Sequence, residues 1–522
     1  MRILPGIFVA VLTCLTGITP NLAWTQIGDP ELLDSGLSAE SIANKPYLDY
    51  ARECADLMME YGTDRYGALH SPMLMSILDV RTRTCPENPL PYDEAYRVTR
   101  RERRNPTGGN FWLDQAFLRV LLDLSEITGD PKYALFASKT AEFTMRNLVD
   151  EKGFFWWGWH RHYDAYRDEM TGHMGNVHEA HIQQGAWPEL WAINQEAVTR
   201  EMEAIWEWHI VDKMTGECNR HGDQQHGCDF AMSGGEYLAA FAFLHKQTQE
   251  PAWLDRARLI ANYYWDKRNP ETNLIPNQPN AGTDRFDGSH FDTSISGLYC
   301  HRLLKAYELT GDPLFRDQAS AHLGAYGKYG YDEKEKQFWA ILRLDGTPER
   351  GPAALEGYEK YQPREHIDLW EPYAAGYQFP IYTAQAYAYA FQLTRDEQML
   401  TNAQRWAECI RKEFPPDRCK KETWYGEYAE KWAQHGTYAE KYARTISFFL
   451  HLHALTGEQA DLDFAKTVAN EAISKLYYRG LFRGHPCKPY YEAMDGVGYL
   501  LRALVQLDRV MNGNETVQME NF

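Results

Sequence analysis

A short segment that ends one helix and starts the next recurs along the chain, and this repeat limits the possible folds more than any other feature. The clearest copies are residues 121–131 and 303–313, which both close on Thr-Gly-Asp-Pro. In that order, Gly suits the left-handed turn after a helix, Asp can cap the next helix, and Pro fits its first turn. Fainter copies occur at residues 247–251, 393–396 and 455–458. The repeat predicts successive helix pairs.

The connections between the copies indicate how those pairs are arranged. Residues 153–185, 217–235, 269–293 and 326–382 form long segments rich in Gly, Pro and Trp. An open solenoid usually has short connections, whereas long loops on one face of a closed ring are typical carriers of sites. We therefore predict an all-α fold, an (α/α) toroid or barrel of six or seven helical hairpins with short strands in its site-bearing loops. A strand-rich second domain is not expected.

The N-terminal 23 residues have the pattern of a secretory signal peptide. Arg2 supplies the positive end, residues 7–15 form the apolar core, and residues 21–23 offer a cleavage point. No other apolar run is long enough to span a bilayer. We expect residues 24–522 to form a single toroid domain that works in the periplasm or is secreted.

The cysteines allow disulfides in such an oxidising compartment. Eight of the nine follow residue 23, and none forms a C-x-x-C zinc pattern. The most local pairs are Cys218–Cys228 and Cys409–Cys419, which makes them the first candidates for a bond.

The charge balance limits the partners. There are 54 Lys and Arg against 73 Asp and Glu, a formal net charge of -19. Such an acidic chain is a poor ligand for nucleic acid or anionic membranes. An anionic substrate would need positive charge gathered in one cleft or supplied by a metal. The one basic run could attract a polyanion but is more typical of a solvated face; it consists of Arg97, Arg100, Arg101, Arg103 and Arg104.

Residues 153–164 are the first candidate site. They form an aromatic loop in which His160 and His162 lie near Asp164. Indole rings stack on the apolar faces of sugars. Filling a helix interface is the alternative role for these rings, and a structural role is the alternative for each His. The loop's tryptophans are Trp156, Trp157 and Trp159.

Residues 176–181 are the second candidate. If they are helical, His178 and His181 share a face, with Glu179 beside them. Imidazoles with a carboxylate suit a divalent transition ion. An exposed polar helix start is the alternative interpretation.

Two further loops carry polar clusters. In residues 217–223, Arg220 and His221 occupy a Gly-flanked turn that suits an anion, although a surface Arg–Asp pair is the alternative. In residues 284–292, Arg285 and His290 lie among several acids, and a solvated polar turn is the alternative.

Taken in order, these clusters resemble a known family. His160, Glu179 nineteen positions later, and the pair Arg220-His221 forty-one positions after Glu179 are similar to the metal and base pattern of polysaccharide lyase family 2. Members of that family are periplasmic pectate lyases with an (α/α) barrel. The resemblance covers these three motifs and the helical repeat. It implies that His160, Glu179 and His221 are metal ligands and that Arg220 is the catalytic base. His162 or His178 could replace His160 as a ligand.

The resemblance also implies a reaction. A divalent ion (Mn, Co, Ni or Ca) would neutralise the carboxylate of a uronic-acid polysaccharide, pectate or polygalacturonate, and a base would remove the C5 proton to start β-elimination. Arginine is ordinarily protonated, and a nearby metal would lower its pKa. If that effect is too small, Arg220 only clamps the carboxylate, and Tyr163 or a histidine transfers the proton.

The remaining expectations concern substrate and assembly. The partner should be an anionic polysaccharide or oligosaccharide, and the protein should be monomeric, with no nucleic-acid partner and no membrane span. Residues expected to contact substrate are Asp114, Trp157, His162, His178, Arg285 and His290.

Two alternatives to a lyase use other features. An (α/α) glycoside hydrolase acting on unsaturated uronides or other glycans would need two carboxyl groups flanking the bond, with Asp114, Asp164, Asp287 and Asp292 as candidates. A non-catalytic glycan-binding protein would use the three tryptophans of residues 153–164 as a stacking platform.

Overall fold

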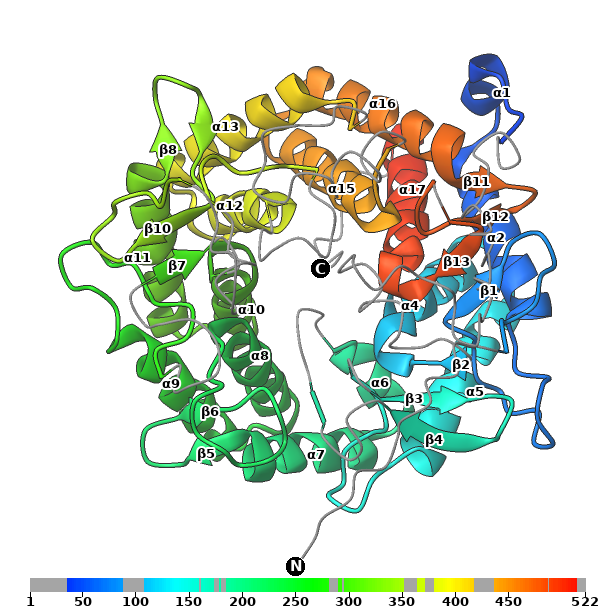
Figure 1. Cartoon of the computed structure of the whole chain (residues 1–522), viewed down its shortest axis with the longest axis horizontal. Coiled ribbons are helices and arrows are strands. Elements are labelled where there is room, and N and C mark those ends of the chain that lie inside the picture. Colours follow the sequence, from blue (N-terminus) through cyan, green and yellow to red (C-terminus); the bar gives the residue numbers. More distant parts are fainter. Residues whose placement is uncertain are drawn as a thin grey trace, which may run out of the picture.

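The helices form a closed ring around a central axis (Figure 1). The structure is a computed structural model, and it describes residues 35–87, 108–158, 161–172, 178–179, 185–280, 290–292, 295–351, 364–370, 380–416, 436–486 and 488–513. A single apolar cluster runs through the described helices and makes them one packed unit. The predicted (α/α) toroid is therefore confirmed.

Within the described residues, the ring contains seven inner–outer helix pairs, in agreement with the predicted six or seven (Figure 1). The last pair joins the two ends of the described chain, because α17 packs on α2. The inner helices are α4 (Phe111–Thr128), α6 (Trp187–Ile193), α8 (Ala231–Thr248), α10 (Cys300–Thr310), α12 (Pro380–Thr394), α15 (Ala439–Thr456) and α17 (Val497–Met511). The outer helices, in the same order, are α5 (Pro131–Asn147), α7 (Gln195–Ala204), α9 (Pro251–Trp265), α11 (Pro313–Tyr329), α13 (Glu397–Glu413), α16 (Gln459–Leu476) and α2 (Tyr47–Tyr61).

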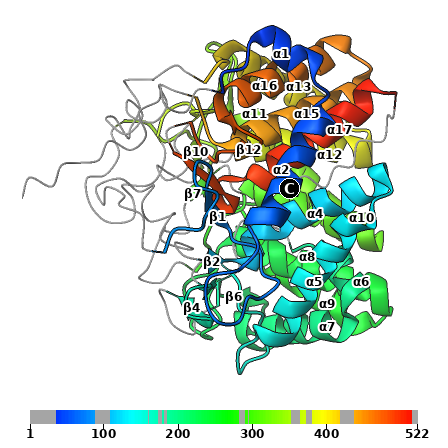
Figure 2. The same ribbon diagram turned by 90° about the vertical axis from the view of Figure 1, so that its right-hand side faces the viewer.

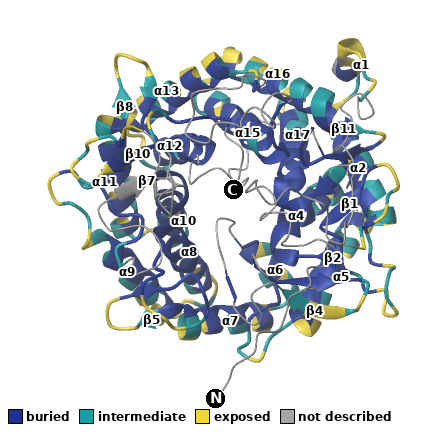
Figure 3. Ribbon diagram, viewed as in Figure 1, coloured by how far each residue is buried: buried dark blue, intermediate teal, exposed yellow. Residues whose placement is uncertain are grey.

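Burial separates the two layers (Figure 3). Inner helices such as α8 and α12 are buried on nearly every side, because the outer layer covers one side and neighbouring inner helices cover others. Outer helices such as α13 have one apolar stripe and an exposed polar face. This difference is the expected consequence of packing two helical layers around one core.

The repeated turn works as the sequence predicts. Gly129 and Gly311 end α4 and α10 in the left-handed conformation, with φ of 71° and 72°. Asp130 and Asp312 then cap α5 and α11 by accepting from backbone N–H groups. A threonine hydroxyl completes each of the five copies by donating to the carbonyl four residues earlier and accepting from the backbone N–H two residues later. These threonines are Thr128, Thr248, Thr310, Thr394 and Thr456.

Short strands lie in the loops at one end of the ring, as predicted (Figure 2). β2, β3 and β4 form an antiparallel three-stranded sheet, and the other strands pair as β1–β13, β5–β6, β7–β10, β8–β9 and β11–β12. The strands are β1 (Ile77–Asp79), β2 (Gly108–Gly109), β3 (Arg161–Asp164), β4 (Glu169–Gly172), β5 (Ile210–Asp212), β6 (Glu217–Cys218), β7 (His290–Asp292), β8 (Tyr331–Asp332), β9 (Gln337–Phe338), β10 (Ile341–Arg343), β11 (Tyr477–Tyr478), β12 (Leu481–Phe482) and β13 (Tyr490–Glu492).

Short helical segments complete the fold. The helix α1 (Ala39–Asn44) packs on α16, and a 3-10 turn (Ala493–Asp495) precedes α17. Two π-helical turns, Ile205–His209 and Ile295–Tyr299, continue α7 and lead into α10. In the part of the chain that the structure describes, we find no helix with the length and apolarity needed to cross a bilayer.

One expectation about the cysteines is wrong. Cys218 and Cys228 are buried thiols that do not form a disulfide. The Cys218 thiol instead lies 3.0 Å from the Tyr264 hydroxyl inside the core. Cys419 and the predicted signal peptide lie outside the described residues, so the Cys409–Cys419 pair and the domain boundary stay predictions.

Candidate functional site

Two segments that are far apart in the sequence meet at the strand end of the ring. Glu179 and His221 form an isolated antiparallel β-bridge, and the Gly222 N–H donates to the His178 carbonyl at 2.9 Å. The prediction that residues 176–181 form a helix is therefore wrong at His178 and Glu179, which are extended. Because neighbouring side chains of an extended segment point to opposite sides, Glu179 and His178 face different surroundings.

Close backbone contacts hold Glu179 beside the start of α4. Gly158 has a φ of 109°, and a Cβ there would lie 2.5 Å from the Glu179 carbonyl oxygen, so only glycine fits. The carbonyl of Gly158 in turn accepts from the Asn110 amide at 2.7 Å. Asn110 is the N-cap of α4, so the helix start, Gly158 and Glu179 form one connected unit.

Asn219 organises the segment that carries Arg220 and His221. Its side-chain oxygen accepts from the His221 N–H at 2.7 Å, and its amide donates to the Asp223 carboxylate at 2.9 Å. The Arg220 N–H donates to the Cys228 carbonyl at 3.0 Å. These bonds fix a compact turn between the β5–β6 hairpin and the start of α8.

Three predicted site residues come together at one carboxylate oxygen. Arg220 Nε lies 3.0 Å and His221 Nε2 lies 3.8 Å from Glu179 Oε1. The same two nitrogens are 3.5 Å apart. The guanidinium also lies over the Phe230 ring, 4.7 Å from its centroid. All three polar side chains are buried, so the Arg220 charge stabilises the Glu179 carboxylate where little water reaches it.

The donor types at this point suit a divalent ion. A carboxylate and an imidazole that converge on one position are two of the three predicted ligands, and such oxygen and nitrogen donors suit Mn, Co or Ni. Across the described ranges, no group of three His, Cys, Asp or Glu side chains is arranged to hold an ion. His160, the third predicted ligand, lies outside those ranges.

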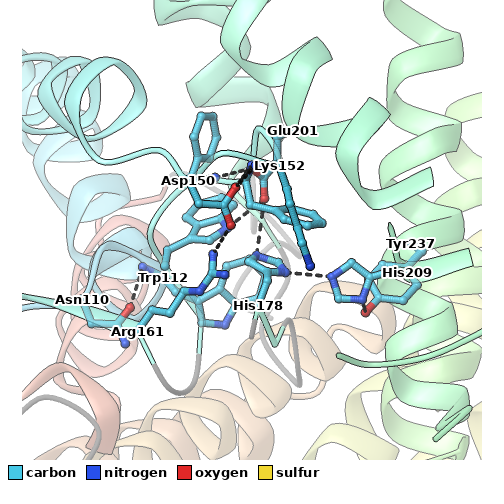
Figure 4. A network of polar contacts seen from close by, with 12 residues as sticks. Asn110, Trp112, Asp150, Lys152, Arg161, His178, Glu201, His209 and Tyr237 are labelled. Atoms are coloured by element: carbon cyan, nitrogen blue, oxygen red, sulfur yellow. Dashed lines mark hydrogen bonds and ion pairs between the residues drawn. The ribbon is translucent and has the colours of Figure 1, made fainter. Parts of the chain in front are cut away.

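His178 belongs to a buried polar network (Figure 4). Because it alternates with Glu179 along an extended segment, its side chain points to the opposite side. Its Nδ1 lies 2.8 Å from His209 Nε2, and its Nε2 lies 3.6 Å from Glu201 Oε1. Burial lowers the pKa of His178 well below its usual value and that of His209 to about 3, and it raises the pKa of Glu201 to about 8. At neutral pH both imidazoles are therefore neutral.

Two other predicted residues lie on β3. His162 is buried, burial lowers its pKa to about 4, and its Nδ1 has no hydrogen-bond partner among the described residues. The Tyr163 hydroxyl donates to Asp168 at 3.2 Å, and burial raises its pKa. The two side chains alternate along the strand, so they face opposite sides of the β2–β3–β4 sheet. No contact joins Tyr163 to Arg220 in the described residues, and its catalytic role stays a prediction.

The predicted substrate contacts Asp114 and Trp157 lie in the core. Burial raises the pKa of Asp114 to about 8, and its carboxyl group accepts from the Ser76 hydroxyl at 2.7 Å. Trp157 is 0 % exposed, and its indole N–H donates to Glu201 at 2.9 Å. A sugar could reach this ring only if the ring left the core, and both substrate roles stay predictions.

Several predicted residues lie outside the described residues. They include His160, His181, Trp159, Arg285, Asp287, Cys419 and the basic run at residues 97–104. His290 and Asp292 belong to β7, where only the backbone is described. Their predicted roles are unchanged.

The sequence analysis missed most of the residues that support the site. Glu201 and His209 come from α7 and the π-helical turn after it, Tyr237 from α8, and Asn110 from the cap of α4. No short motif joins them, because only the packing of separate helices brings their side chains together. The one local signal is Asn219, directly before the Arg-His pair.

Comparison with known proteins supports the resemblance over this region. Residues 93–232 match the family model described as periplasmic pectate lyase. That segment contains Glu179, Arg220 and His221. A pectate disaccharide-lyase of Dickeya dadantii (strain 3937) is 32% identical over 117 residues, which is 22% of this chain and 22% of that protein. The matched part thus spans about a fifth of the relative's length.

Solved structures share the general architecture at low similarity. An unsaturated glucuronyl hydrolase from Bacillus sp. GL1 matches with a TM-score of 0.45 and 14% identity, covering 92% of this chain and 98% of that chain. A family 76 glycoside hydrolase from a bovine Bacteroides thetaiotaomicron strain matches with a TM-score of 0.47 and 11% identity, covering 90% and 79%.

Proposed function

We propose that this protein is a metal-assisted lyase that cleaves a uronic-acid polysaccharide, pectate or polygalacturonate, by β-elimination. The convergence of Arg220 and His221 on one Glu179 oxygen supports the proposal most directly. Residues 93–232, which contain all three residues, also match the pectate lyase family model, and this match supports the proposal from the sequence.

The reaction begins with a proton that is hard to remove. The C5 hydrogen of a uronic acid is weakly acidic until the neighbouring carboxylate is neutralised. A base then takes that proton, the electrons form the C4–C5 double bond, and the C4–O bond breaks with its electron pair going to the leaving sugar oxygen. The products are an unsaturated uronide and a shortened chain.

The described residues divide these tasks. Glu179 and His221, with His160 as the predicted third ligand, would hold a divalent ion that neutralises the substrate carboxylate when bound. We propose that Arg220 removes the C5 proton. Its buried guanidinium is paired with Glu179 at 3.0 Å, and such pairing favours the charged form. A base role therefore requires that a bound divalent ion neutralise the Glu179 carboxylate, so that the carboxylate no longer stabilises the charged guanidinium. Otherwise Arg220 clamps the substrate carboxylate.

The test is degradation of polygalacturonate by the purified protein supplied with Mn, Co, Ni or Ca. We expect the ultraviolet absorbance of an unsaturated uronide to rise, and we expect a chelator to abolish the rise. Release of saturated sugars that does not depend on metal would contradict the proposal.

Substitutions at the site separate the roles of its residues. Glu179→Gln and Arg220→Ala should each lower kcat/KM by about 100-fold or more, because each removes a group that acts on developing charge or on the proton. Arg220→Lys keeps a positive charge but has a lower pKa, so a pH profile of activity that moves to lower pH would favour the base role, and an unchanged profile would favour the clamp role. Arg167→Lys is the control, because Arg167 is an exposed residue on the β3–β4 turn; its activity should equal that of the wild type.

A glycoside hydrolase is the second candidate, but Asp114, the predicted acid whose pKa burial raises to about 8, is 1 % exposed and would reach a sugar only if the core around it opened. A hydrolase also needs a second carboxyl group across the scissile bond. Product analysis separates the two reactions, since hydrolysis gives saturated ends and elimination gives an unsaturated one.

We also propose that the protein works in the periplasm. The family description and the predicted leader at residues 1–23 support this location. An anionic oligosaccharide or polysaccharide is the expected partner, and a monomer is the expected state.

A further inference from the structure

Two buried histidines connect the segments that carry the proposed catalytic residues. His178 directly precedes Glu179, and its Nδ1 lies 2.8 Å from Nε2 of His209 on the π-helical turn after α7 (Figure 4). His209 Nδ1 lies 2.7 Å from the carbonyl oxygen of Asn219, the residue directly before Arg220. The side-chain path therefore runs from the neighbour of Glu179 to the neighbour of Arg220.

Backbone hydrogen bonds make the same connection at both ends. The Asn219 N–H donates to the His209 carbonyl at 2.7 Å, so Asn219 is bound by both the main chain and the ring of His209. The Gly222 N–H donates to the His178 carbonyl at 2.9 Å. The hydrogen bond between the two imidazoles therefore joins the same two segments that the Glu179–His221 bridge joins.

The acceptors in this path fix where the protons sit. A carbonyl oxygen can only accept, so His209 Nδ1 carries a hydrogen and donates to Asn219. The Tyr237 hydroxyl, 2.8 Å from the same nitrogen, is a second partner there. In a neutral His209, Nε2 must then accept, so His178 Nδ1 donates to it. Each ring has one tautomer and one orientation.

Apolar packing and Glu201 hold the His178 ring in place. Phe154 stacks on it with centroids 4.2 Å apart and an interplanar angle of 5°. On the other edge, Glu201 Oε1 lies 3.6 Å from His178 Nε2 and accepts from the Trp157 indole at 2.9 Å. The ring therefore has little freedom to turn away from His209.

We propose that His178 and His209 are positioning residues whose mutual hydrogen bond sets the spacing between Glu179 and the Arg220-His221 pair. The effect on catalysis rests on the lyase function proposed above. The effect on the local backbone does not, because the hydrogen bonds involved are present without substrate. In this role His178 acts through its neighbour and is not itself a metal ligand.

The closing experiment compares two substitutions at one position. His178→Phe keeps a ring to stack on Phe154 but lacks the donor. His178→Asn loses the ring but brings an amide N–H near the position of Nδ1. We expect kcat on polygalacturonate to fall by about 10- to 100-fold in His178→Phe, with KM changed less than about threefold, because the catalytic groups are displaced while substrate contacts remain. His178→Asn should recover most of that loss.

A second readout needs no substrate. Hydrogen exchange measured by mass spectrometry should be faster in peptides covering residues 217–225 in His178→Phe and near the wild-type rate in His178→Asn. His451→Phe is the matched control, because His451 is another buried histidine, bonded to Gln392 on α12. It should leave kcat and the exchange of residues 217–225 unchanged.

The outcomes separate the two proposals. If the wild-type protein cleaves no uronic-acid polymer, the proposed function fails, and the exchange of residues 217–225 still tests the positioning role. Unchanged exchange in His178→Phe, or exchange equally fast in His178→Asn, would overturn that role. So would a wild-type kcat in His178→Phe. If His178→Phe does not fold, His178→Gln replaces it, because its amide lies near the Nε2 position and cannot donate to His209.

Discussion

Asp114 shows how burial alone sets the state of a single side chain. It lies in the first turn of α4, is 1 % exposed, and has one carboxyl oxygen without a hydrogen-bond partner among the described residues. Burial outweighs the favourable hydrogen bond from Ser76, so its pKa rises from 3.8 to about 8. The side chain is therefore protonated in the folded protein at neutral pH and ionised in the unfolded chain.

This difference predicts a pH-dependent stability. Between the unfolded and folded pKa values the folded state keeps a proton that the unfolded state has lost, so the free energy of unfolding falls as the pH rises. Asp114→Asn removes this titration. The stability of the wild type relative to Asp114→Asn should therefore fall by about 1–3 kcal/mol between about pH 5 and about pH 7. Urea unfolding of both proteins at both pH values measures it, and a constant difference would contradict the prediction.

At the scale of elements, the repeated turn places the same residue in the same local role in different copies, so the copies can be compared by their tertiary contacts. Asp130 and Asp312 cap α5 and α11 in the same way, by accepting from the N–H two residues later. Asp312 also accepts from Arg258 of α9 at 2.6 Å. The Asp130 side chain is 43% exposed, and its ion pair with Lys132 is longer, at 3.6 Å. The two copies therefore share a local role and differ in tertiary contacts.

Alanine at the two caps should show that difference. Asp130→Ala should cost about 1 kcal/mol of stability, the usual cost of losing an N-cap. Asp312→Ala should cost somewhat more, about 1.5 kcal/mol, because it also removes the ion pair with Arg258, which keeps only Asp255 as a carboxylate partner. Chemical denaturation of both variants is the measurement. Equal costs would mean that the contact between α9 and α11 adds nothing to stability.

Over the whole molecule, closure of the ring gives every helix pair two neighbours. α17 packs on α2, α4 and α15, and β1 pairs with β13, so the start and end of the described chain are joined in both layers (Figure 1). The Tyr47 hydroxyl donates to Asn470 and the Leu48 N–H donates to Asp508 at the same junction. A terminal unit of an open solenoid lacks such contacts on its outer side.

Closure predicts that α17 is as important for stability as a helix in the middle of the chain. Leu504→Ala, at a residue that is 0 % exposed, should cost about 2–5 kcal/mol and speed hydrogen exchange in both α2 and α4. Leu303→Ala in α10 is the comparison, with a similar cost but faster exchange in α8 and α12. A cost below about 1 kcal/mol for Leu504→Ala would indicate that the ring is not closed by packing.

The sequence by itself determined the helix pairs and the ring, and it predicted the residues of the candidate site. Caps and turns depend on residues within one turn of the chain, so the Thr-Gly-Asp-Pro repeat could be interpreted locally. The types and order of Glu179, Arg220 and His221 likewise predicted that the three residues belong to one site. Only the tertiary structure decided that His178 faces away from Glu179, that Trp157 and Asp114 are buried, and that Cys218 and Cys228 are not bonded. These features depend on how each segment packs against helices that are distant in the sequence, and no local sequence pattern predicts that packing.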